Sequence, residues 1–138
     1  MIVVDASVGI KWLKTDEKGA EAAREIFRDN IEKRSSIIVP SLFFLEIANV
    51  LALTKKVTRA MLKRRIQFLN KSGLTVHSFS KTNLEEAAIL AKQYSTTVYD
   101  MLYAVIAKEL GCQFITADER FVEKTHFPFV KLLRTDNA

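Results

Sequence analysis

The sequence has few residues that interrupt regular structure. Four glycines and two prolines in 138 residues indicate long helices and strands joined by short connections. The one cysteine, Cys112, excludes an internal disulfide and gives no sign of an oxidising compartment. With 49% hydrophobic and 27% charged residues, the composition predicts one folded domain over residues 1–138 and excludes a disordered chain.

Long hydrophobic runs are also missing. The longest apolar stretch, residues 37–53, contains a proline, a glutamate and an asparagine, which argue against a membrane span. The apolar start of the chain ends at Asp5, so we expect no signal peptide. These absences predict a cytoplasmic protein with no membrane partner.

Negative charge is missing from one long segment. No aspartate or glutamate occurs between Ile47 and Leu84, although this segment contains Lys55, Lys56, Arg59, Lys63, Arg64, Arg65, Lys71 and Lys81. In a chain of net charge +5, such a stretch favours a polyanionic partner, and nucleic acid is the natural candidate. The alternative is a solvated helix face that acids elsewhere in the fold balance.

Short apolar runs alternate with segments of helical periodicity. Strands are expected at residues 2–4, 37–39, 74–79, 113–116 and 129–132. Helices are expected at residues 7–13, 16–33, 42–53, from 59 onward, 82–94, 98–110 and just after 118. Ser41 and Thr58 are predicted helix caps, and Thr82 with Glu85 has the spacing of a capping box. This alternation predicts an α/β fold, a three-layer α/β/α single domain with a central parallel sheet.

Two aspartates follow predicted strands directly. Asp5 comes after the run Ile2-Val3-Val4, and Asp118 comes just past a strand that ends at Thr116. Parallel strands deliver such residues to the carboxyl edge of the sheet, where open α/β folds carry their sites. For Asp5 taken alone, the alternative is an aspartate that caps a helix or lies in a turn. Two carboxylates side by side at one edge would repel each other unless a cation neutralised them.

Glu46 lies in residues 42–51, a predicted helix that is apolar almost all round and is therefore expected to be buried. A buried carboxylate needs a partner. Asn49, three residues on, is one candidate to hold a carboxylate oxygen, and a buried salt bridge is the alternative. Asp100 starts the helix at 98–110, where the helix dipole alone explains an acid. Tyr103 and Ala104 share its side of that helix.

The four acids together form an oxygen-only donor set. The sequence has no His-Cys or Cys-Cys spacing for zinc, and hard oxygen ligands suit Mg²⁺ or Mn²⁺. No glycine-rich phosphate loop is present, which argues against an enzyme driven by a nucleotide.

The order of these motifs resembles the PIN-domain nucleases, and most closely the VapC-type toxins of prokaryotic toxin–antitoxin pairs. The matching segments are Val4-Asp5-Ala6-Ser7, Glu46 with Asn49, Tyr99-Asp100 with Tyr103 and Ala104, and Thr116-Ala117-Asp118-Glu119-Arg120-Phe121. The resemblance implies an endoribonuclease that depends on Mg²⁺ or Mn²⁺, with a small antitoxin partner and a homodimeric state. It also implies that Asp5, Glu46, Asp100 and Asp118 line one metal pocket, and Asp100 owes its place mainly to this resemblance. Ser7, Asn49 and Thr116 match neighbouring polar positions.

These assignments lead to a hypothesis for the reaction. Three aspartates bind one or two cations, and Glu46 completes the site or orients a bound water that attacks the phosphodiester. Ser7 or Thr116 fixes a carboxylate or water, while Lys55, Lys56, Arg59, Lys63 and Arg64 hold the RNA backbone. Two alternatives stay open: an RNA-processing PIN nuclease outside toxin–antitoxin systems, and a regulatory PIN domain that binds nucleic acid without cleaving it.

Overall fold

The computed structural model describes residues 1–14 and 16–135, and within them five strands form one parallel sheet. The strands are β1 (Ile2–Val4), β2 (Ile37–Pro40), β3 (Thr75–His77), β4 (Gln113–Thr116) and β5 (Val130–Leu132). Their order is β3-β2-β1-β4-β5, so the first strand lies at the centre. All carboxyl ends therefore meet at one edge of the sheet.

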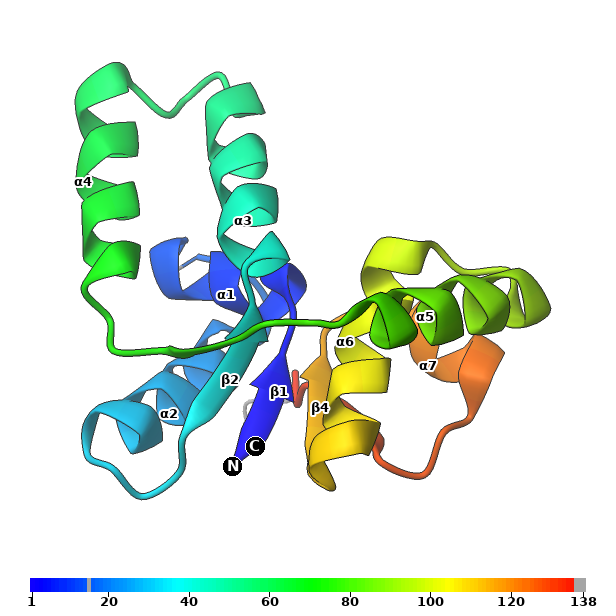
Figure 1. Ribbon diagram of the computed structural model, residues 1–138. Helices are drawn as coiled ribbons and strands as arrows, with labels where there is room; N and C mark the ends of the chain where they lie inside the picture. The colour runs from blue at the N-terminus through cyan, green and yellow to red at the C-terminus, as the bar shows by residue number, and fades with distance from the viewer. Residues whose placement is uncertain (15, 136–138) are drawn as a thin grey trace.

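In the same described residues, seven helices flank the sheet. They are α1 (Ala6–Leu13), α2 (Ala20–Ile31), α3 (Leu42–Leu53), α4 (Arg59–Asn70), α5 (Lys81–Tyr94), α6 (Val98–Leu110) and α7 (Glu119–Thr125). Figure 1 shows α1 and α2 to one side of the strands and α5, α6 and α7 to the other. The predicted three-layer α/β/α fold is confirmed. The extent of the domain over residues 1–138 stays a prediction, because residues 136–138 fall outside the described part.

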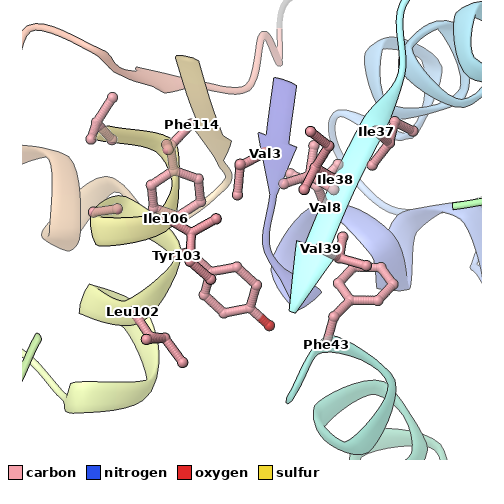
Figure 2. Close-up of a cluster of buried hydrophobic side chains, with 14 of the residues drawn as sticks. Val3, Val8, Ile37, Ile38, Val39, Phe43, Leu102, Tyr103, Ile106 and Phe114 are labelled. Atoms are coloured by element: carbon pink, nitrogen blue, oxygen red, sulfur yellow. The ribbon is translucent and has the colours of Figure 1, made fainter. Parts of the chain in front are cut away.

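Helix α6 packs against the neighbouring strands β1 and β4. Every residue of α6 from 101 to 107 is buried, and the small side chains of Ala104 and Ala107 allow a close approach to the sheet. Figure 2 shows Tyr103 and Ile106 of this helix beside Val3 and Phe114. The start of α6, including Asp100, is thereby held near the ends of the two central strands.

The α3–α4 hairpin extends past the carboxyl edge of the sheet (Figure 1). Only one face of α3 is covered, through Phe43, Ile47 and Leu51. Leu45 and Leu53 are 67% and 74% exposed. The expectation that this apolar helix is buried almost all round is therefore wrong, because α1, α4 and β2 pack against one side of it and leave the other open.

Two helix starts differ from the predicted caps. The Ser80 hydroxyl caps α5 by accepting a bond from the Asn83 N–H, and the Asn83 side chain accepts one from the Ser80 N–H. The capping box predicted at Thr82 and Glu85 is wrong by two residues, since both lie inside α5, which begins at Lys81. Ser41 does precede α3, but its side chain makes no capping hydrogen bond.

Element lengths are otherwise close to expectation. The helix expected at 16–33 is shorter, Ala20–Ile31, and the strand expected at 74–79 spans Thr75–His77. Across the part of the chain that the structure covers, each helix is too short or too polar to cross a lipid bilayer.

Gly9 marks a close contact between α1 and α3. A Cβ atom on Gly9 would lie 2.5 Å from Cζ of Phe43 and 2.7 Å from Cδ1 of Ile47. Only glycine permits this approach, because the packed interior cannot yield by that much. The contact sets the position of α3, which carries Glu46, relative to the start of α1 at Asp5.

We predict that Gly9→Ala lowers the free energy of unfolding by roughly 1–3 kcal/mol through overpacking. The sign is informative, since alanine in a helix interior is normally better than glycine by about 1 kcal/mol. Urea denaturation followed by circular dichroism measures the change. Gly73→Ala is the matched control, because Gly73 has open space around it and a φ of 73°, so it reports backbone strain alone. A Gly9→Ala protein more stable than wild type would contradict the packing argument.

Candidate functional site

Asp5 lies at the end of the central strand and is 6% exposed. Its Oδ1 caps α1 by accepting a hydrogen bond from the Val8 N–H at 3.3 Å. The Ser7 hydroxyl donates to Oδ1 and the Thr116 hydroxyl donates to Oδ2, each at 2.5 Å. Asp5 is therefore a helix cap, as its alternative interpretation proposed, and in addition both of its carboxylate oxygens are held by hydroxyl groups.

The turn after β4 holds these two hydroxyls in place. Ser7 Oγ accepts a bond from the Ala117 N–H at 2.9 Å, and Thr116 Oγ1 accepts one from the Asp118 N–H at 3.1 Å. The Asp118 side chain caps α7. This network joins the ends of the neighbouring strands β1 and β4, and it places Asp5 and Asp118 at the same edge of the sheet, as the strand pattern predicts.

Glu46 on α3 is half-buried, and its partner comes from the opposite helix. The Tyr103 hydroxyl on α6 donates to Oε1 of Glu46 at 2.6 Å. The expectation that Asn49 holds this carboxylate is wrong: Asn49 is exposed on the uncovered side of α3, and no hydrogen bond among the described residues joins the two. The salt bridge weighed as an alternative is likewise absent from the ion pairs of the described residues.

Asp100, in the first turn of α6, interacts through its charge with the other predicted acids. Its N–H donates to the hydroxyl of the capping residue Thr97 at 3.1 Å. Burial is the main reason why the pKa values of Asp5, Glu46 and Asp100 are raised. The charge of Asp100 adds to the rise at the first two, and the charge of Asp118 adds to the rise at Asp100. These charge effects connect Asp100 with each of the other three predicted acids, and we call the four residues the cluster.

The pKa values of Asp5 and of the neighbouring Tyr103 are both raised. Burial outweighs the hydroxyl bonds to Asp5 and raises its pKa from 3.8 to about 6. The pKa of Tyr103 is raised above its ordinary value, first by burial and then by the hydrogen bond to Glu46. The phenol therefore stays protonated, and acts as a hydrogen-bond donor, throughout the physiological range.

The chemistry of the cluster fits a hard divalent cation. Its donors are carboxylate and hydroxyl oxygens, and positive charge among them would offset burial and mutual repulsion. The side chains do not form a closed cage: no group of three or more histidine, cysteine or acidic side chains among residues 1–14 and 16–135 is arranged to hold one ion. Mg²⁺ commonly keeps several waters and uses only one or two protein carboxylates, so an open site of this kind suits it.

The basic residues predicted to contact RNA lie apart from the acids, on the α3–α4 hairpin. All five are exposed: Lys55, Lys56, Arg59, Lys63 and Arg64. None of them forms an ion pair with another described residue. The alternative of a face balanced by acids elsewhere in the fold therefore finds no support in the described part of the chain.

Two side chains that contact the acids received no role from the sequence. The sequence pattern predicts only that Tyr103 shares the side of Asp100, and it assigns nothing to Thr97. Sequence spacing could have indicated both. Tyr103 is three residues after Asp100 and is therefore its neighbour on the helix, and Thr97 is three residues before Asp100, the distance at which a cap residue binds a backbone N–H. The reach of Tyr103 to Glu46 depends on how α3 and α6 face each other, which spacing does not contain.

A parallel sheet that gathers carboxylates and supporting hydroxyls at its carboxyl edge defines an α/β domain with an acidic site. The sequence profile of the PIN domain matches residues 2–126, and the chain belongs to the PIN-domain family. It is similar to Ribonuclease VapC3 of Pyrobaculum aerophilum, with 28% identity over 130 residues that cover 89% of this chain and 93% of that protein.

Solved structures show the same fold at lower identity. A toxin–antitoxin complex from Klebsiella pneumoniae superposes with a TM-score of 0.70 at 14% identity and covers 99% of this chain and 100% of that one. VapC20 of Mycobacterium tuberculosis, described as a toxin that cleaves the sarcin–ricin loop, gives 0.69 at 15% identity and covers 91% and 95%.

The raised pKa of Asp5 predicts how the stability of the metal-free protein changes with pH. The folded state binds this proton more tightly than the unfolded state, so the associated stability is complete below about pH 4 and is lost as the pH rises through about 6. The difference corresponds to roughly 2–3 kcal/mol. We predict that Asp5→Asn removes most of the loss between pH 4 and 7, measured by urea denaturation with chelator present.

Glu123→Gln on α7 is the control, because it removes an exposed negative charge without burial. It should keep the wild-type profile. Superimposable profiles for wild type and Asp5→Asn would contradict the assignment of the pH dependence to Asp5.

Proposed function

We propose that this protein is a metal-dependent endoribonuclease and the toxin of a VapBC-type toxin–antitoxin pair. The observation that carries the proposal is the cluster of four acids, Asp5, Glu46, Asp100 and Asp118. The pKa values of the first three are raised by burial and by neighbouring negative charge, and a bound cation would offset both effects. Membership of the PIN-domain family and the similarity to Ribonuclease VapC3 support the same activity.

Each part of the cluster has a role in this proposal. Asp5, Asp100 and Asp118 would share one or two Mg²⁺ or Mn²⁺ ions, each held by no more than two of these carboxylates and completed by waters. A bound ion would lower the pKa of one of its waters and shield the charge of the phosphodiester. Glu46 completes the site or orients the attacking water. Ser7 and Thr116 keep both oxygens of Asp5 in a fixed orientation through their hydroxyl bonds.

The α3–α4 hairpin supplies the attraction for RNA. A cluster of four acids repels a phosphate backbone, so binding depends on positive charge close by but outside the cluster. The exposed lysines and arginines of the hairpin provide it, and they form no ion pairs with described residues that would have to be broken first. Contacts of this kind are salt-sensitive and largely independent of sequence.

Protein partners are part of the proposal. Leu45, which precedes Glu46, and Leu53, at the end of α3, are large exposed apolar side chains, and such groups favour a protein interface. A second copy of the chain and a small antitoxin are the partners we propose. The toxin–antitoxin complex among the similar structures supports the antitoxin. A cytoplasmic location follows from a role in cleaving cellular RNA.

We predict that the protein cleaves labelled RNA in Mg²⁺ or Mn²⁺ and that chelator abolishes cleavage. Asp5→Asn and Asp100→Asn should each lower kcat/KM at least about 100-fold while far-UV circular dichroism stays unchanged. Glu123→Gln, which removes an exposed acid outside the cluster, should retain full activity.

Three other results would redirect the proposal. Cleavage that resists chelation would contradict metal dependence. Absence of both Mn²⁺ binding and cleavage would favour a regulatory PIN domain that binds nucleic acid. Robust cleavage without growth arrest on expression would favour RNA processing over a toxin.

The hairpin is tested separately from the chemistry. We predict that Lys56→Ala/Lys63→Ala weakens RNA binding about tenfold at 50 mM salt and lowers the slope of log Kd against log salt by about 1.5, since each phosphate contact contributes roughly 0.7–0.9. Fluorescence anisotropy in an Asp5→Asn background measures binding without cleavage. Lys18→Ala/Lys92→Ala removes two exposed lysines elsewhere and matches the net charge. Equal effects of the two pairs would show that only net charge matters.

A further inference from the structure

We propose that Tyr103 is a positioning residue for the nuclease reaction, whose hydroxyl fixes one oxygen of Glu46 and leaves the other for cation or water. The proposal rests on the nuclease function given above. It assigns a role to a side chain that belongs to the hydrophobic core by its ring and to the acidic site by its oxygen.

The ring of Tyr103 has no freedom to move. The residue is 0% exposed, and its ring stacks on Phe114 of β4 with centroids 5.8 Å apart and an interplanar angle of 15°. Figure 2 shows the ring within the core cluster, with its hydroxyl at the end that points away from Phe114. A donor attached to a packed core ring is held in position by the whole sheet and not by a flexible loop.

The hydroxyl makes one short, charge-assisted bond. It donates to Oε1 of Glu46 at 2.6 Å, across the space between α6 and α3. Oε2 of Glu46 takes part in no hydrogen bond among the described residues. Glu46 is only half-buried and has three rotatable bonds, so without this bond its carboxylate would sample several rotamers. The Tyr103 bond selects one of them.

The chemistry favours tyrosine at this position. A phenol hydroxyl donates a hydrogen bond to the carboxylate without adding a formal charge to the site. Lysine or arginine in the same place would neutralise Glu46 and bring a positive charge against the cation. Phenylalanine would keep the packing and lose only the hydroxyl, which makes Tyr103→Phe a clean test.

The first measurement is kinetic. We expect Tyr103→Phe to lower kcat about 10- to 100-fold with KM for RNA nearly unchanged, and to weaken Mn²⁺ binding in calorimetry of the RNA-free protein. Tyr94→Phe is the matched control, because Tyr94 on α5 packs its ring on Phe127 and its hydroxyl takes part in no hydrogen bond among the described residues. It should leave both quantities at wild-type values. Equal values for the two variants would overturn the proposal.

The second measurement separates positioning from packing. In a Glu46→Ala background, Tyr103→Phe should lower kcat no further, because its effect acts through Glu46. In the metal-free proteins, Tyr103→Phe should lower Tm in the wild-type background and leave it unchanged or raise it in the Glu46→Ala background, where the buried hydroxyl has lost its partner. Independent, additive effects would overturn the proposal. If the wild-type protein cleaves no RNA, the proposed function fails, and the Tm comparison still decides whether Tyr103 holds Glu46.

Discussion

The site depends on one buried carboxylate held between two strands. The register of β1 and β4 pairs Val4 with Ile115, so the next residues along, Asp5 and Thr116, lie opposite each other at the edge of the sheet. Their hydrogen bond closes the two strand ends together. Ser7 adds a second hydroxyl from the first turn of α1, and the backbone of the turn after β4 orients both hydroxyls. These hydrogen bonds form a clamp around the Asp5 carboxylate.

The clamp carries an energetic cost that the hydrophobic core offsets. Burial raises the pKa of Asp5 in spite of its hydrogen bonds, and the charge of Asp100 raises it further, so the metal-free protein keeps acids together that would be more stable apart. The buried run of α6 against β1 and β4 holds Asp100 in the cluster all the same. Proteins commonly retain such unfavourable local arrangements where function requires them.

Features of the site that depend on local sequence pattern could be predicted, whereas contacts between residues far apart in the sequence could not. Asp5 and Asp118 follow strands, and strand ends in a parallel sheet share an edge, so local pattern and one topological rule place both correctly. The argument that the Glu46 carboxylate needs a partner is confirmed by its bond to Tyr103, although α3 is covered on one side only. Its true partner, Tyr103, is 57 residues away in sequence, and no helical spacing contains that contact. Asn49 illustrates the same limit: it lies three residues after Glu46 on α3, as a contact would require, but its side chain is exposed to solvent.

The separation of charge in this fold follows from what the proposed reaction needs. The acids of the cluster lie at or near the sheet edge and are partly or fully buried, whereas the cations of the α3–α4 hairpin are exposed and form no ion pair with another described residue. If lysines or arginines paired with the acids, they would neutralise the groups that attract a divalent cation. If the cations were absent, the acids would repel the RNA backbone at the distance where binding begins. A domain that is to hold both a metal ion and a polyanion, as we propose for this one, would therefore gain from keeping the cations of the hairpin away from the cluster.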